Sequence, residues 1–199
     1  MTASGLFISA RSDMANPEQS LTEWDEVQGQ VASRMSRRQL LTAAQLLTDY
    51  LARAENQRTR SEALAFLGSV LEEQGDLEGA IKAILEAHVI ASNIDYHRYT
   101  LELTLGRLFR LNKEPTEALS WYWRALQTAA QDPITSGAAA LKSYLQLKGE
   151  TGLDSEEQLL ARRIITQAWT LLGLSGQPDL ANLTATADIL LMAGSRPIA

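Results

Sequence analysis

The stretch from Leu67 to Ala125, LGSVLEEQGDLEGAIKAILEAHVIASNIDYHRYTLELTLGRLFRLNKEPTEALSWYWRA, decides the fold because it contains one pattern of packing residues twice. The first copy consists of Leu67, Gly68, Leu71, Ala80, Ile84 and Ala87. The second copy consists of Leu105, Gly106, Phe109, Ala118, Tyr122 and Ala125, each 38 positions after its counterpart. A pattern that recurs with one internal spacing predicts two helical hairpins of the same kind, stacked one after the other.

Small residues occupy the positions where the two helices of each hairpin are expected to cross. Gly68 and Gly106 fall in the first helix of their units, and Ala80 and Ala118 begin the packing face of the second. A larger side chain at any of these points would push the two helices apart. The spacing therefore predicts close helix–helix contacts at these positions.

The predicted turns carry residues that end and start helices. Gly75 suits a left-handed helix end, and Asp76 suits the N-cap of the next helix. In the second copy, Pro115 suits the first turn of a helix. Turn chemistry and packing pattern therefore predict the same hairpins.

This pattern resembles the tetratricopeptide repeat (TPR), which runs Leu-Gly, aromatic, Ala, aromatic, Ala over about 34 residues. The two clear units span 61–94 and 99–132, with degenerate units on either side. Their longer period adds about one helical turn, which keeps the apolar face in phase. The resemblance implies an all-α fold, a right-handed superhelix of antiparallel helix hairpins with about nine helices.

Residues 1–19 lack a sustained apolar period and are expected to form a flexible tail before a single TPR-like domain over 20–199. Capping patterns that begin at Ser20, Ser36 and Ser155 predict the starts of three helices. The last helix is expected to cover the open end of the stack, as the terminal units of solenoids require. The predicted helices span 21–34, 37–55, 61–74, 76–92, 96–111, 115–130, 133–148, 155–172 and 179–193.

Composition limits the classes of function. The 199 residues suffice for one domain, and 45% hydrophobic with 21% charged residues is ordinary for a globular protein. The absence of cysteine excludes disulfides and thiolate metal sites and fits a reducing compartment, so we expect a cytoplasmic protein. A net charge of −6 argues against a nucleic-acid partner, and the arginines within 34–38 and 53–60 are interpreted as solvated faces.

No targeting or membrane segment is predicted. No apolar run approaches the roughly 18 residues that a membrane-spanning helix needs. The N-terminal stretch Gly5-Leu6-Phe7-Ile8 is apolar, but no basic segment precedes it, so a secretory signal is not expected.

A catalytic function receives little support. His88 falls on the apolar stripe of its predicted helix and is interpreted as a packing residue, and His97 as a surface residue. No glycine-rich phosphate loop is present, and the paired carboxylates are ordinary helix charges. We therefore predict no enzyme, no catalytic residue, no metal site and no cofactor.

The resemblance places a binding face on the first helices of successive units, because in TPR proteins these helices line the concave surface. Chaperone-binding TPR proteins use Lys and Asn where this chain has Ala65 and Ser69, so their clamp for a C-terminal carboxylate is not assembled here. The residues expected on this face are Glu62, Ala65, Ser69, Glu72, Thr100, Leu103, Arg107, Arg110, Ser136, Ala139, Ser143 and Gln146.

Arg107 and Arg110 are the most specific part of this predicted face. Because three positions separate them on one helix, both guanidinium groups can point the same way and hold a carboxylate of a bound peptide. In the alternative interpretation, they pair with Glu72, Glu73 or Glu102 on adjacent helices. The sequence favours neither.

Trp121-Tyr122-Trp123 is the densest aromatic cluster, and Tyr122 takes the core position of the motif. Adjacent residues on a helix diverge by about 100°, so Trp121 and Trp123 cannot both follow Tyr122 into the core. Packing between repeats is the first interpretation of these tryptophans. The alternative is an exposed anchor for a partner, because tryptophan is enriched at binding hot spots.

The sequence thus predicts a non-catalytic module that binds a protein or peptide in its concave groove, as an adaptor, assembly factor or small cytoplasmic chaperone. The alternative is a regulatory module that senses a peptide or self-associates to control another protein. A homodimer stays open in either case.

Overall fold

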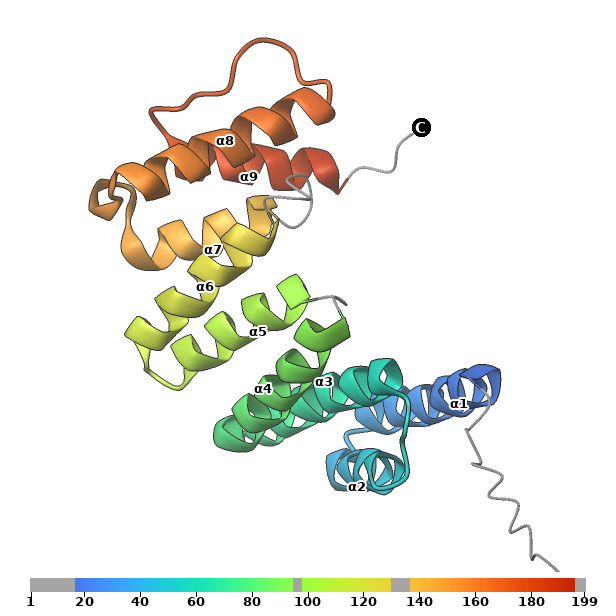
Figure 1. The fold of residues 1–199 in the computed structure, drawn as a ribbon. Coiled ribbons are helices and arrows are strands. Elements are labelled where there is room, and N and C mark those ends of the chain that lie inside the picture. Colours follow the sequence, from blue (N-terminus) through green and yellow to red (C-terminus); the bar gives the residue numbers. More distant parts are fainter. Residues whose placement is uncertain (1–16, 95–97, 130–136, 196–199) are drawn as a thin grey trace, which may run out of the picture.

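The computed structural model describes residues 17–94, 98–129 and 137–195. Within them the chain forms nine α-helices, one short 3-10 turn and no strand (Figure 1). The helices are α1 (Pro17–Ser36), α2 (Leu40–Leu51), α3 (Gln57–Gln74), α4 (Leu77–Ile94), α5 (Arg98–Leu111), α6 (Pro115–Ala129), α7 (Ala138–Lys148), α8 (Ser155–Leu171) and α9 (Leu183–Gly194). The predicted all-α fold is confirmed.

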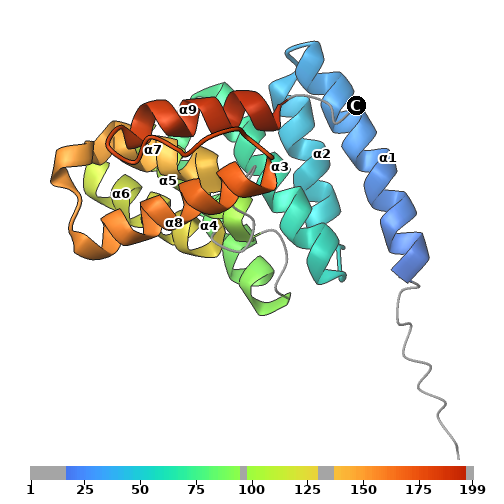
Figure 2. The same ribbon diagram turned by 90° about the horizontal axis from the view of Figure 1, so that it is seen from above.

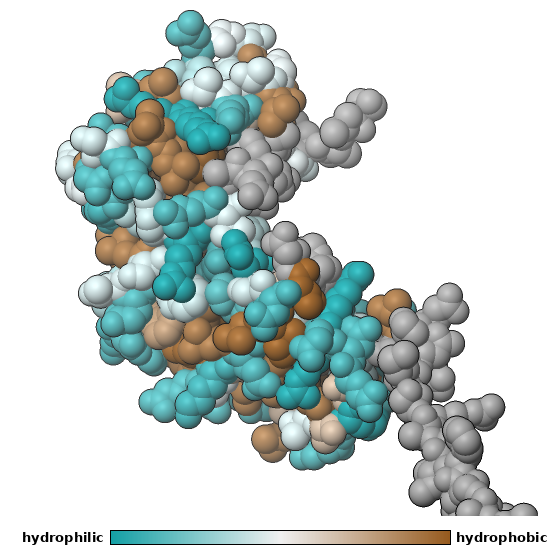
Figure 3. All heavy atoms as spheres, in the orientation of Figure 1, coloured by the Kyte–Doolittle hydropathy of each residue, from teal (hydrophilic) through white to brown (hydrophobic). Residues whose placement is uncertain are grey.

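The helices form a stack of hairpins in chain order. Helix α3 packs against α4 and α5 against α6, while α4–α5 and α6–α7 contacts join successive hairpins. Seen from above, α1 and α2 lie at one end of the molecule and α6, α7 and α8 at the other (Figure 2). The space-filling view shows that the stack is bent, with a hollow on one side of its outline (Figure 3). This arrangement is a TPR-like solenoid.

The repeated glycines lie where the sequence pattern predicts close crossings. A Cβ atom at Gly68 would lie 2.6 Å from Ile84 Cδ1, and one at Gly106 would lie 2.4 Å from Tyr122 Cδ1. Ala80 and Ala118 are fully buried on the partner helices. Real Cβ atoms essentially never approach another atom this closely, so each glycine makes room for one large side chain of the next helix.

The two equivalent turns have one geometry but different residues. Gly75 ends α3 with φ +84°, and Lys113, its counterpart after α5, has φ +62°. Asp76 Oδ1 accepts a hydrogen bond from the Gly79 N–H at 2.9 Å and so caps α4, and Pro115 is the first residue of α6. The turn predictions are therefore confirmed, and a lysine adopts the left-handed conformation that glycine adopts one repeat earlier.

The first three helices differ from their predicted boundaries. The capping prediction at Ser20 is wrong because α1 already begins at Pro17. The prediction at Ser36 is also wrong, since its Oγ donates to the Ser33 carbonyl at 2.9 Å and α2 ends at Leu51 rather than near residue 55. Helix α3 starts four residues early because Asn56 accepts from two of its first backbone N–H groups. Residues 1–16 of the expected tail lie outside the described residues.

The C-terminal helices differ from the prediction in their caps. Asp154 rather than Ser155 caps α8, and Glu157 completes a capping box with it. Helix α9 begins at Leu183 rather than near residue 179, because Asn182 caps it and the Glu150 carboxylate accepts two further N–H groups. Helix α9 packs against both α7 and α8, which agrees with its expected role as the cover of the stack.

Candidate functional site

A pocket of about 190 Å³ lies between α5 and α7. Its walls are formed by Leu103, Thr104, Arg107, Arg110, Tyr122, Ser143 and Gln146, and we call it the groove pocket. The sequence places five of these residues on the concave face: Leu103, Arg107, Arg110, Ser143 and Gln146. The structure therefore brings together most of the residues predicted on α5 and α7.

Helix periodicity and one cross-helix contact build the groove pocket. Leu103, Arg107 and Arg110 share a face of α5 because four and three positions separate them. Tyr122 comes from α6, and its ring crosses α5 at Gly106, where no side chain blocks it. The ring is buried and only 2% of the residue is exposed, yet it forms part of the pocket wall. In the preceding unit, Ile84 occupies the equivalent position and offers no polar group.

Tyr122 lines the groove pocket, although its sequence pattern predicts only a core position for it. The tyrosine fills the core position of the repeat motif, as predicted, but its side chain is long enough to reach the opposite face of the hairpin. The signal was present in the sequence, since a glycine faces this tyrosine across the hairpin. The tyrosine side chain extends past Gly106, so Tyr122 also reaches the groove pocket.

Arg107 is held by a carboxylate from the neighbouring repeat. Its guanidinium donates to both oxygens of Glu72 on α3, with Nη2 2.7 Å from Oε2 and a second contact from Nη1 to Oε1. The hydrogen bond with Glu72 raises the pKa of Arg107 above its ordinary value, against the opposing effect of burial. Of the two interpretations of Arg107, pairing with a glutamate of another helix is thus confirmed. The Glu72 carboxylate compensates the charge of Arg107.

Arg110 differs from Arg107 in its surroundings. It is exposed, and no carboxylate of the described residues forms an ion pair with it. Burial raises the pKa of Tyr122 above 10.0, although the charges of Arg110 and Arg107 and a hydrogen bond from Arg110 oppose the shift. The hydroxyl of Tyr122 is therefore protonated at neutral pH and available as a hydrogen-bond donor. Among the described residues, the groove pocket therefore has one cation without a compensating anion.

Several residues expected on the concave face, among them Glu62, Ser69 and Thr100, lie outside the groove pocket. Glu62 accepts a hydrogen bond from the Trp24 indole at 2.6 Å and one from Arg58 Nε at 3.2 Å, so its carboxylate ties α3 to α1. Ser69 and Thr100 are exposed, and the Ser69 hydroxyl donates to the Ala65 carbonyl of its own helix. The described walls of the pocket therefore come from the second clear unit and α7.

The two tryptophans pack against side chains of other helices. Trp121 lies 5.2 Å from the His88 ring on α4, and the Arg124 guanidinium lies 4.7 Å above its face. Trp123 lies 5.7 Å from the Tyr144 ring on α7. Both residues are half-buried. These contacts agree with packing between repeats, the first of the two interpretations.

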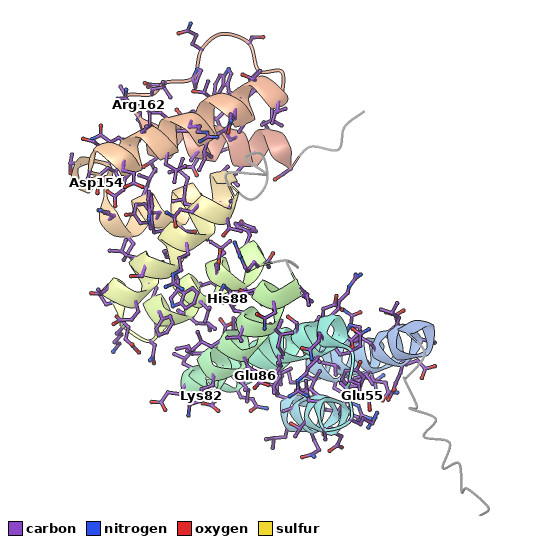
Figure 4. All side chains as sticks on the ribbon, viewed as in Figure 1. Glu55, Lys82, Glu86, His88, Asp154 and Arg162 are labelled. Atoms are coloured by element: carbon purple, nitrogen blue, oxygen red, sulfur yellow. The ribbon has the colours of Figure 1, made fainter. Side chains whose placement is uncertain are left out.

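His88 contacts side chains of two neighbouring helices, Glu102 on α5 and Trp121 on α6. His88 is half-buried near the end of α4 (Figure 4), and its Nε2 lies 3.1 Å from the buried Glu102 carboxylate on α5. In the part of the chain that the structure describes, no three His, Asp or Glu residues are placed to hold a metal ion. His97 and Ser136 lie outside the described residues.

No helix among the described residues is long and apolar enough to cross a membrane. Three clusters of buried hydrophobic residues form the core of the stack, and each contains residues from several neighbouring helices.

Comparison with solved structures identifies the fold. BtubC (BKLC) from P. vanneervenii has a TM-score of 0.64 and 17% identity, over 92% of this chain and 75% of that one. A "putative kinesin light chain" with nearly identical TPR-like repeats from Podosopora anserina has a TM-score of 0.53 and 13% identity, over 92% of this chain and 100% of that one. No protein-family profile and no curated protein matches the sequence. The chain therefore has the TPR-like repeat fold.

Proposed function

We propose that this chain is a non-catalytic module that binds a segment of a partner protein in the groove pocket. The observation that carries the proposal is the composition of the pocket, where exposed Arg110 and the Tyr122 hydroxyl lie beside the apolar Leu103. TPR-like solenoids generally present extended concave surfaces to protein partners. A wall that combines apolar contact with hydrogen-bond donors suits a peptide.

The size of the groove pocket supports a protein segment over a small-molecule substrate. Sites for drug-sized ligands usually enclose about 300–1,000 Å³. The groove pocket holds about 190 Å³, enough for one side chain or chain end of a longer segment. The remainder of the segment would lie along α5 and α7, where the wall residue Gln146 is exposed.

The biological role that fits such binding best is that of an adaptor, assembly factor or small chaperone. The net charge of −6 supports a protein partner over a nucleic acid, and the absence of cysteine supports a reducing compartment such as the cytoplasm. We propose these roles as uses of the same groove.

Site-specific photo-crosslinking tests the proposal in the cells that make this protein. A photoreactive phenylalanine analogue replaces Gln146, which lines the groove pocket, or Gln127, an exposed glutamine of α6 that does not line it. We expect the Gln146 variant to crosslink to one contiguous segment of a partner, identified by mass spectrometry, and the Gln127 variant to give no such product. Equal labelling from both positions would contradict binding in the groove pocket.

A further inference from the structure

We infer that the groove pocket binds a single carboxylate of its partner, through the Arg110 guanidinium and the Tyr122 hydroxyl, and that Glu72 is an internal competitor for this ligand on Arg107. The inference rests on the proposed function and deepens it. In this inference Arg110 and Tyr122 bind the carboxylate of the partner, and the ion pair between Glu72 and Arg107 opposes that binding.

The charge of the groove pocket selects an anion. No acidic side chain is among the described residues of its wall. Arg107 is neutralised by the carboxylate of Glu72, which leaves the Arg110 charge uncompensated among the described residues. The Tyr122 hydroxyl in the wall adds a second donor, because a tyrosine is protonated at neutral pH. A guanidinium and a hydroxyl in the wall of one pocket offer hydrogen-bond donors to an oxygen anion.

The ion pair between Glu72 and Arg107 is an example of carboxylate binding by an arginine of this pocket. Both of its oxygens contact the Arg107 guanidinium, which is the paired geometry that arginine offers to carboxylates. Arg110 lies three positions further along the same helix and presents the same donor group, with no acidic partner among the described residues. An incoming carboxylate at Arg110 would therefore repeat an interaction that the chain already makes at Arg107.

The charge balance favours a carboxylate over a phosphate. The one uncompensated cation among the described residues of the wall matches the single negative charge of a carboxylate, whereas a phosphate monoester carries about −1.5 to −2 at neutral pH. A carboxylate of a protein segment has two sources, the chain terminus and the side chain of Asp or Glu. The same donors would bind either, so the experiment includes both.

The test uses the full chain labelled with ¹⁵N and follows the side-chain Nε–Hε signals of its arginines by NMR. The probes are N-acetylglycine for a C-terminal carboxylate, N-acetylaspartate N-methylamide for a side-chain carboxylate, and N-acetylglycinamide as a neutral analogue. We expect the Arg110 signal to shift saturably with at least one carboxylate and not with the neutral amide. The probe with the lower dissociation constant identifies the source of the carboxylate.

Three variants separate recognition from packing. Arg110→Gln removes the charge together with its own NMR signal, so binding to this variant is followed on the Arg107 Nε–Hε signal from the same pocket. It is expected to weaken carboxylate binding at least about tenfold, the loss typical of a charge-assisted hydrogen bond. Tyr122→Phe keeps the ring over Gly106 and removes only the hydroxyl, and we expect it to weaken binding several-fold. Glu72→Gln frees Arg107 and raises the charge of the pocket, so this variant is expected to bind the probe more tightly than the wild type.

The Glu72→Gln result distinguishes the inference from a purely structural role of the ion pair. If Glu72 only positioned Arg107, its replacement would leave carboxylate binding unchanged or weaken it, and either result would overturn the inference. Equal shifts at Arg110 and at Arg162, an exposed arginine of α8 (Figure 4), would also overturn it, because binding would then be non-specific. Carboxylate binding without crosslinking from Gln146 would overturn the proposed function instead. Crosslinking without carboxylate binding would overturn only the inference.

Discussion

Replacement of Gly106 by leucine is expected to lower the free energy of unfolding by about 1–3 kcal/mol, the usual cost of overpacking a buried contact. A Cβ atom at this position would lie 2.4 Å from Tyr122 Cδ1 and 2.5 Å from Cε1. The Tyr122 residue is 2% exposed, so the close packing around its ring leaves it little room to move away. Urea denaturation followed by circular dichroism measures the change.

Gly29 provides the matched control for this substitution. It lies in α1, it is exposed, and a Cβ atom there would meet nothing within 4 Å. Leucine favours helix over glycine, so Gly29→Leu is expected to raise the free energy of unfolding by about 0.5–1 kcal/mol. If Gly106→Leu proved neutral, the α5–α6 crossing would be assigned to the wrong residues.

Replacement of Glu157 by glutamine is expected to lower the free energy of unfolding at pH 7 by about 1.5–3 kcal/mol, the range for hydrogen bonds to a charged group. The Glu157 carboxylate is buried and accepts hydrogen bonds from the Tyr144 hydroxyl, the Lys148 ammonium and the Asp154 N–H. These contacts join α7 to α8 across the turn. A neutral amide cannot satisfy the lysine in the same way.

The pH dependence of this effect has a definite sign. Burial alone would raise the pKa of Glu157, but the hydrogen bonds from Lys148, Tyr144 and Asp154 outweigh it and lower the pKa below 4.5. A carboxyl whose pKa is lowered by folding stabilises the folded state above its unfolded pKa. This stabilisation is lost as the pH falls from about 4.5 through the folded value. The difference between wild type and Glu157→Gln should therefore be constant near neutrality and shrink below pH 4.5.

Glu156→Gln is the control for this second prediction, because the neighbouring carboxylate is exposed and lies in the same first turn of α8. Its loss is expected to change the free energy of unfolding by at most about 0.5 kcal/mol, as for most surface substitutions. Denaturant titrations of both variants between pH 3 and 7 measure the two effects. Equal losses in the two variants would contradict the role given to the buried carboxylate.

The hairpins could be predicted from the sequence because their packing requirements are local and repeated. Gly106 and Tyr122 lie sixteen positions apart, as do Gly68 and Ile84, so the pattern indicates both the crossing and the turn between them. Helix starts were harder to predict where two capping residues adjoin. Asp154 and Ser155 both suit an N-cap, and the backbone places the cap at the aspartate.

The electrostatics of the groove pocket could be predicted only in part. The spacing of Arg107 and Arg110 placed both on one face, but three glutamates were equally plausible partners. Which of them pairs depends on how α3 and α5 are aligned, and the structure selects Glu72 for Arg107. The third candidate, Glu102, lies beside His88 and Arg98 instead. Such choices depend on the relative position of two helices, which no local pattern specifies.

The most direct test of the account is the affinity of the partner segment that crosslinks from Gln146, measured by titration calorimetry against defined variants. The account predicts that Arg110→Ala weakens binding of this segment at least about tenfold, as expected for a charge-assisted contact. It also predicts that Arg124→Ala and Trp121→Phe, which change the tryptophan surface on α6, leave the affinity within about twofold. Unchanged affinity in Arg110→Ala together with a large loss in Trp121→Phe would contradict the account and place the interface at the tryptophans.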